Sequence, residues 1–312
     1  MFDILFGNLT TFPFLKGGTS YCDFAKIDLG GAGNVAVALS HLGGKTCFIG
    51  KAGDDCWGKL YKEDLIVKGV TTRMFFEQGC STGLTLVALG KKAQRSFHVS
   101  RGANNKLSID EINRSLKLLK NSECLYFSGY SLVASPQKDA VLHAVNFAKK
   151  NHLHVIFDPG APNLIRSNFR LFNDLLDICD VFLPNLDEAK AMTKTDNLKT
   201  AILELQQRGK FTALKCGASG CFLIGRKNNT KTPAFKVCCQ DTTGAGDSFA
   251  AALVFGLINH FPIKSIGQLA NWLAAQLVTH IGARSFPPKK EISNFLARTG
   301  LTVGTKEEKN AC

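Results

Sequence analysis

The glycine-rich segment 241–249 has the residue types and spacing most directly suited to chemistry. It reads Asp241-Thr242-Thr243-Gly244-Ala245-Gly246-Asp247-Ser248-Phe249, and an apolar run follows it. A glycine-rich turn that opens into a helix leaves several main-chain N–H groups unpaired at the positive end of the helix dipole, where phosphate binds. Asp247 lies in the first turn of the expected helix. Its carboxylate can accept a proton from an alcohol while the amides hold phosphoryl oxygens, so the segment predicts phosphoryl transfer.

Alternating strands and helices are expected to position this turn. Short, continuous apolar runs are typical of strands buried on both faces of a parallel sheet. These runs are Ile4–Phe6, Cys47–Ile49, Leu125–Phe127, Val155–Phe157, Val181–Leu183, Ala213–Leu214 and Phe222–Ile224. Segments with apolar residues at helical spacing separate them, for example Val35 to Leu42. We therefore expect an α/β fold with a doubly wound, mostly parallel sheet, which binds ligands beyond the carboxyl ends of its strands.

Two stretches interrupt the alternation, at about residues 10–29 and 72–101. Both are rich in turn-forming residues, and residues 96–100 alternate polar and apolar side chains as a half-exposed strand does. We expect these segments to form a small β-sheet lid over the site. The remaining pattern predicts a single domain over residues 1–304, followed by a polar C-terminal tail at 305–312.

Composition narrows the class of protein. The 312 residues are 45% hydrophobic and 20% charged, as in an ordinary soluble globule. The net charge is +13, but the basic residues are scattered and form no run of five, which argues against nucleic-acid binding. We also expect no membrane partner, because no eighteen-residue apolar stretch occurs. Eleven cysteines without a C-x-x-C pair, and no signal-like start, favour free thiols in the cytoplasm.

The segment 241–249 resembles the C-terminal signature of the PfkB carbohydrate kinases, the relatives of ribokinase, fructokinase and adenosine kinase. Further blocks resemble that family in the same order along the chain: residues 30–36 with 42–44, then 50–58, 185–188, 217–220 and 282–283. The resemblance implies a ribokinase-like fold. It also implies a kinase that uses ATP and Mg²⁺ to phosphorylate a hydroxyl of a sugar or sugar derivative.

The resemblance assigns catalytic roles residue by residue. It implies Asp247 as the general base, with an anion hole formed by the amides of Gly244, Ala245 and Gly246. Asn185 and Glu188, from the Asn-x-x-Glu motif, would order Mg²⁺ through water. A loop cap after a strand is the alternative role for Asn185.

Nucleotide-binding residues follow from the same comparison. Those implied to line the nucleotide are Lys215, Gly217, Ser219 and Gly220, with Asn271 and Ala283 on the adenine side. For Lys215, a solvent-facing strand end is the alternative. Asp241 and Thr243 occupy positions that in some family members hold a monovalent cation, here K⁺.

The acceptor side departs from the family pattern. Gly31 and Asn34 would contact sugar hydroxyls, although Asn34 also reads as a helix N-cap. Many members carry an aspartate where this chain has Phe12, so the usual sugar-anchoring carboxylate is missing. Its candidate replacements are Asn8, Thr11, Asp23 and Asp28. Arg101 could face an anionic substituent, or simply the surface.

The acceptor itself stays open at this point. The glycine block has one residue fewer than in ribokinase or fructokinase, a short form similar to that of heptose-phosphate kinases. An apolar Phe12 would favour a nucleoside kinase, in which the ring stacks on a base. The loss of the acidic anchor raises a third interpretation, a non-catalytic sugar- or nucleotide-binding regulator, although a binding module has no need of Asp247. The lid edges suggest a homodimer formed by strand pairing.

Overall fold

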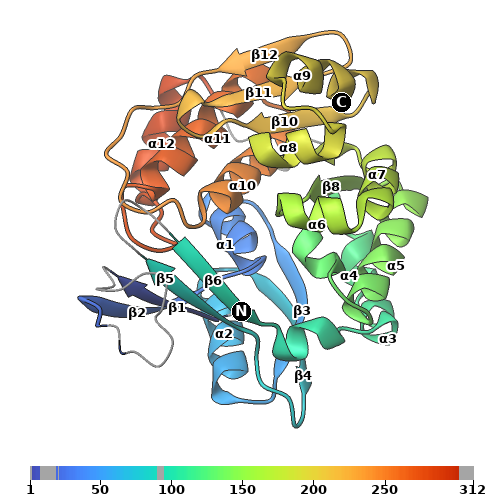
Figure 1. Ribbon diagram of the computed structural model, residues 1–312, viewed down its shortest axis with the longest axis vertical. Helices are drawn as coiled ribbons and strands as arrows, with labels where there is room; N and C mark the ends of the chain where they lie inside the picture. The colour runs from blue at the N-terminus through green and yellow to red at the C-terminus, as the bar shows by residue number, and fades with distance from the viewer. Residues whose placement is uncertain (1, 8–18, 20, 90–94, 302–312) are drawn as a thin grey trace.

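A six-stranded sheet forms the centre of the larger part of the molecule (Figure 1). The computed structural model describes residues 2–7, 19, 21–89 and 95–301. The parallel strands, in spatial order, are β7 (Cys124–Ser128), β8 (His154–Asp158), β9 (Val181–Phe182) and β10 (Phe211–Lys215). The antiparallel strands β11 (Cys221–Ile224) and β12 (Asn229–Thr232) extend the sheet at the β10 edge. The mostly parallel sheet expected from the apolar runs is confirmed.

Helices cover both faces of this sheet, which explains why its strands read as continuous apolar runs. On β8, Ile156 packs into one core cluster while Val155 and Phe157 pack into the other. The first cluster is closed by α1 (Gly33–His41), α10 (Ala245–Ile258), α11 (Ile263–Leu277) and α12 (Lys289–Arg298). The second is closed by α3 (Ile109–Asn113), α4 (Leu116–Lys120), α5 (Gln137–Lys150), α6 (Pro162–Ser167), α7 (Phe169–Ile178), α8 (Leu186–Thr193) and α9 (Leu198–Gln207).

A separate small sheet is formed by residues near the N-terminus. Its spatial order is β2 (Phe24–Leu29), β1 (Phe2–Gly7), β5 (Leu84–Leu89) and β6 (Arg95–Ser100). A further pair of strands follows β2 and α1 in the chain. These are β3 (Cys47–Gly53) and β4 (Thr71–Glu77), which pair in parallel and are connected by α2 (Cys56–Val67). The predicted strands at Ile4–Phe6 and Cys47–Ile49 therefore exist, but they lie outside the main sheet. An apolar run predicts a strand without specifying its sheet.

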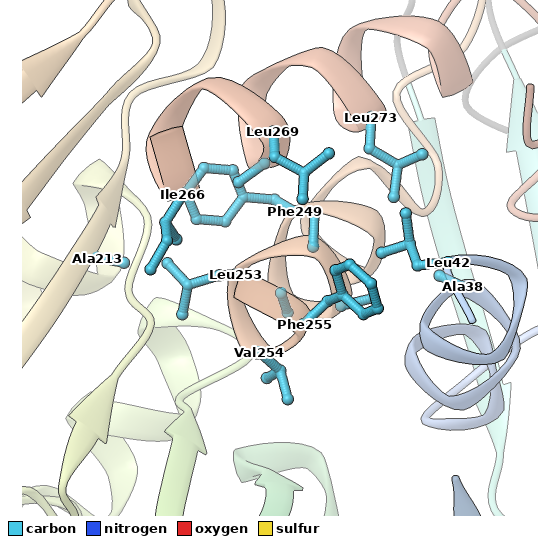
Figure 2. Packing of buried hydrophobic residues seen from close by; sticks show 14 of the residues in the cluster. Ala38, Leu42, Ala213, Phe249, Leu253, Val254, Phe255, Ile266, Leu269 and Leu273 are labelled. Atoms are coloured by element: carbon cyan, nitrogen blue, oxygen red, sulfur yellow. The ribbon is translucent and has the colours of Figure 1, made fainter. Parts of the chain in front are cut away.

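The helix α10 is buried on all sides and holds the glycine-rich turn at its N-terminus. Every residue from 248 to 256 is buried. Figure 2 shows Phe249, Leu253 and Phe255 among side chains of α1 and α11, with Ala213 of the main sheet nearby. A helix packed on every side cannot shift without disturbing the core, so the turn before it is firmly placed. Within the described part of the chain, no helix has the length and hydropathy that crossing a membrane would require.

Candidate active site

A cavity of ≈1450 Å³ lies between the small sheet and the carboxyl ends of the main strands. The small sheet contributes Asp3, Thr85 and Phe97 to its wall. The main sheet contributes Asp158 and Lys215, each the last residue of its strand. The turn at 244–247 forms another part of the wall. The cavity is therefore where a doubly wound sheet is expected to bind its ligands.

Asp247 occupies the first turn of α10 and faces this cavity. Its side chain is half-buried, and the Nδ2 of Asn34 donates a hydrogen bond to its Oδ2 at 2.9 Å. Burial raises the pKa of Asp247 to about 6, against the hydrogen bond from Asn34, which lowers it. A carboxylate with this pKa is well suited to act as a base near neutral pH.

Gly244 of the turn is required by close contacts and by backbone conformation. Gly244 caps α10 with φ +78, in the left-handed region. A Cβ at this position would lie 2.8 Å from both Cα and O of Ala283. A Cβ at Gly246 would lie 3.8 Å from the Nζ of Lys215, so the lysine ammonium is next to the turn. The turn and the lysine together place positive charge and main-chain donors at one point of the cavity.

Lys215 is held in the cavity by a buried carboxylate. Its Nζ lies 2.8 Å from Oδ2 of Asp158, and both side chains are largely buried. Burial by itself would lower the pKa of Lys215, but the charges of Asp158 and Glu188 raise it, so the ammonium stays charged. The solvent-facing alternative for Lys215 is therefore wrong. Asp158 is an acidic residue at the end of an apolar strand, which is the kind of sequence signal that marks this edge of the sheet.

Asn185 and Glu188 form a capping box at the start of α8. The Oδ1 of Asn185 accepts a hydrogen bond from the Glu188 N–H at 2.9 Å, and Oε2 of Glu188 accepts one from the Asn185 N–H at 2.7 Å. The cap role weighed for Asn185 is thus present, yet both residues also line the cavity. Burial raises the pKa of Glu188 to about 7, against the effect of Lys215. In the part of the chain that is described, no three acidic, histidine or cysteine side chains form a ready-made metal cage.

Asn34 lies inside α1, because the residue that caps this helix is Ala32. The N-cap interpretation of Asn34 is therefore wrong. Its amide lies between two charged groups, with Arg284 Nε donating to its Oδ1 at 2.8 Å and its own Nδ2 donating to Asp247. Sequence reasoning missed Arg284, since nothing in the sequence links residue 284 to residue 34.

Comparison with known proteins agrees with this geometry. The model of the pfkB family carbohydrate kinases matches residues 10–290. The chain belongs to this family. It is 31% identical to fructokinase-1 of Zea mays over 294 residues, which cover 88% of this chain and 90% of that one. Adenosine kinase from Sinorhizobium meliloti has a similar fold, with TM-score 0.83, 23% identity and coverage of 88% and 84%.

A third relative is a putative ribokinase II from E. coli, solved in complex with ATP and Mg²⁺. Its fold matches with TM-score 0.81 and 23% identity, over 95% of this chain and 96% of that one. The ribokinase-like fold expected from the sequence is confirmed, and the protein is a sugar kinase, a phosphotransferase of the pfkB family.

In this carbohydrate kinase the predicted nucleotide residues are only partly brought to the cavity. Lys215, Gly217, Gly220 and Asn271 line it, whereas Ser219 and Ala283 are not among the lining residues. The amide nitrogen of Asn271 donates to the carbonyls of Thr232 and Pro233 at 3.0 and 3.1 Å, so it also ties α11 to the chain after β12.

The pair predicted to hold a monovalent cation has neighbours of its own. Thr243 lines the cavity, while Asp241 is buried behind it. The Asp241 carboxylate accepts hydrogen bonds from the N–H and Oγ1 of Thr243 and from the N–H of Gly282. Asp241 thereby connects the glycine-rich turn to the loop at 282–284.

Of the residues predicted to bind the acceptor, three line the cavity: Gly31, Asn34 and Arg101. Asn8, Thr11 and Phe12 lie outside the described residues. Arg101 donates to three neutral acceptors: Oδ1 of Asn105, the carbonyl of Tyr130 and Oε1 of Gln137. Asn105 and Tyr130 are each 2.5 Å from the guanidinium nitrogens, and Gln137 is 3.0 Å away. Its position in the cavity wall and these three hydrogen bonds favour a role in the site for Arg101 over a plain surface position.

A further carboxylate on the acceptor side, Asp3 of β1, was missed. Burial raises the pKa of Asp3 to about 6, while a hydrogen bond with Thr85 lowers it. A Cβ at Gly30 would lie 1.9 Å from Oδ2 of Asp3, so only glycine leaves room for this carboxylate. An acidic residue inside the apolar run at 2–6 was the sequence signal for a functional position.

Proposed function

We propose that the protein transfers the γ-phosphate of ATP to a hydroxyl of a sugar or sugar derivative, with Asp247 as the general base. The observation that carries this proposal is the Asp247 carboxylate, held by Asn34 beside the glycine-rich turn on the cavity wall. The acceptor oxygen attacks the γ-phosphorus while its proton passes to Asp247. The bond from phosphorus to the bridging oxygen breaks, and ADP leaves with that electron pair.

The charge that develops on the transferred group is stabilised at the turn. Main-chain N–H groups of Gly244, Ala245 and Gly246 form the proposed anion hole, of which that of Ala245 donates to the carbonyl of Thr242 at 3.2 Å in this structure. The Lys215 ammonium lies next to the turn. Mg²⁺ would supply neutralisation of the phosphate charge. Glu188 and Asn185 would hold the ion through water molecules. Contact through water is expected because the Glu188 carboxylate is already engaged in capping α8. The structural neighbour solved in complex with ATP and Mg²⁺ supports ATP and Mg²⁺ as ligands of this site. Binding of K⁺ at Asp241 and Thr243 stays a prediction.

For the acceptor, we propose a hexose or related sugar, supported by the fructokinase relatives. Asp3 would replace the carboxylate missing at residue 12, because it is the acidic side chain of the small sheet that lines the cavity. Arg101, whose guanidinium meets only neutral acceptors in the hydrogen bonds above, could bind a phosphate or carboxylate group on the acceptor. A nucleoside acceptor remains the second candidate, and the intact base and turn argue against a non-catalytic regulator.

The small sheet would act as the lid, closing over the acceptor to exclude water. Strands β2, β5 and β6 fall in the proposed lid segments 10–29 and 72–101, and β1 joins them in one sheet. The single-domain division, the C-terminal tail, a homodimer through the lid edges and a cytoplasmic location remain predictions. The ten described cysteines are free.

A panel of acceptors tests the function. Sugars, sugar acids, sugar phosphates and nucleosides are each incubated with Mg²⁺ and ATP, and ADP release is measured. We expect a sugar to give the highest kcat/KM. Asp3→Asn should raise the acceptor KM about tenfold, as loss of a charged hydrogen bond does, with the ATP KM unchanged. If nucleosides alone release ADP, the second candidate replaces the first. If no acceptor does, the proposal is wrong.

The pH dependence of kcat/KM follows from the pKa of Asp247. A base must be ionised to accept a proton, and burial raises the pKa of this carboxyl to about 6. Activity should therefore fall as the pH drops through about 6 and level off above it. Rates from pH 4.5 to 9 at constant ionic strength measure this. Because Asp3 also has a pKa of about 6, the same profile is recorded with Asp3→Asn. A limb that vanishes in that variant would mean that Asp247 is not its source.

A further inference from the structure

Arg284 lies behind the cavity wall, between α1 and α2. It follows the loop at 282–283, and its side chain is only 8% exposed. One side of the guanidinium contacts Asn34 on α1, where Nε donates to Oδ1 at 2.8 Å. The other contacts α2, where a terminal nitrogen donates to Oδ2 of Asp64 and the planar group lies 5.5 Å from the ring centroid of Tyr61. Arg284 is not among the residues that line the cavity, so it does not contact the substrates itself and acts through a neighbouring side chain or through its charge.

The orientation of the Asn34 amide is determined by the groups on its two sides. A guanidinium can only donate hydrogen bonds, so the amide atom that faces Arg284 must be the oxygen. The amide nitrogen then faces Asp247 and donates to its Oδ2 at 2.9 Å. Without Arg284, the amide could turn over and present its oxygen to the carboxylate. Two acceptors in contact repel each other unless Asp247 is protonated.

We propose that Arg284 is a positioning residue: by holding the Asn34 amide in one orientation, it keeps the Asp247 carboxylate ionised and fixed in its rotation. This inference rests on the proposed role of Asp247 as the base. An ion pair and two hydrogen bonds form one continuous series from α2 to α10. The residues in this series are Asp64, Arg284, Asn34 and Asp247.

The surroundings of Asp247 explain why the amide matters. Asp158 on β8 and Asp3 on β1 disfavour its ionised form through their charges. Lys215 on β10 favours the ionised form, as does the hydrogen bond from Asn34. Tyr126 on β7 also faces this group, and burial raises its pKa well above the usual range, so it stays neutral. Loss of the amide donor would therefore leave Lys215 opposed by two carboxylates.

Arg284→Met removes the donors while keeping an unbranched apolar side chain. We expect the acidic limb of the kcat/KM profile to move to higher pH by about one unit. The kcat/KM of the variant should then be several-fold below that of the wild type at pH 6, and close to it at pH 9. The ATP KM should stay within about twofold. The matched control is Arg208→Met, because Arg208 also lies between an aspartate and an asparagine oxygen, those of Asp177 and Asn173, on the far surface. This control should leave the profile unchanged.

A double-mutant cycle with Asn34→Ala distinguishes positioning from a plain charge effect. If Arg284 acts through the amide, Arg284→Met should shift the limb by less than half as much when Asn34 is absent. An equal shift in both backgrounds, or no shift in either, would overturn the proposal. If Arg284→Met does not fold in a thermal unfolding scan, Arg284→Gln takes its place, since a glutamine amide can both donate and accept and so no longer sets the orientation of the Asn34 amide, and the limb must again move to higher pH. Failure of the base role is seen separately, as turnover retained by Asp247→Asn.

Discussion

Asp247→Asn is expected to lower kcat by about 10³- to 10⁴-fold while ATP still binds with nearly wild-type affinity. The amide has the shape of the carboxylate, so the hydrogen bond from Asn34 and the start of α10 should be preserved. It cannot accept the acceptor's proton, and the alcohol then attacks without a base. The nucleotide contacts proposed at the turn use main-chain N–H groups, which the substitution leaves in place.

Two measurements check this prediction. Steady-state ADP release with a saturating acceptor gives kcat, and calorimetric titration with a non-hydrolysable ATP analogue gives nucleotide affinity. Asp177→Asn is the matched control, because it makes the same chemical change in a surface ion pair with Arg208. Its kcat should equal that of the wild type. An Asp247→Asn enzyme that turns over within tenfold of wild type would remove this residue from the base role.

Gly244→Ala should lower kcat/KM for ATP by about 10²- to 10³-fold, a loss like that of one main-chain donor to the transition state. The added Cβ would lie 2.8 Å from the backbone of Ala283, which Asp241 helps to hold through Gly282. Backbone cannot rotate away as a flexible side chain can, so the turn itself must move. The left-handed φ adds a conformational cost of about 1 kcal/mol for any residue with a Cβ.

Gly300→Ala provides the control that separates these two effects. Gly300 has φ +67, similar to the +78 of Gly244, but among the described residues no atom lies within 4 Å of the Cβ that alanine would add. Gly300→Ala should lose about 1 kcal/mol of unfolding free energy in a denaturant titration, and Gly244→Ala should lose more, because it also makes the contact with Ala283. Gly300→Ala alone should keep wild-type kinetics. Equal kinetics in the two variants would show that the contact with Ala283 does not position the anion hole.

Local sequence was sufficient where a feature depends on neighbouring residues. The apolar runs predict strands because both faces of the main sheet are buried, and the strands at 124–128, 154–158 and 211–215 bear this out. The turn at 241–249 is also local, since its glycines and the following apolar helix are consecutive. Sequence order could not assign Ile4–Phe6 to the small sheet, because pairing partners are set by packing between distant segments.

The kinase family, the α/β class and the position of Asp247 at a helix start could be predicted without the structure, because each is carried by consecutive residues. The tertiary structure alone decided which side chains act on that carboxylate. Asn34 is 213 residues from Asp247 and Arg284 is 250 residues from Asn34, and Lys215 is 57 residues from the Asp158 that holds it. Hydrogen bonds and burial depend on distance in space, and no local pattern records which distant residues the folded chain brings within 3 Å of one another.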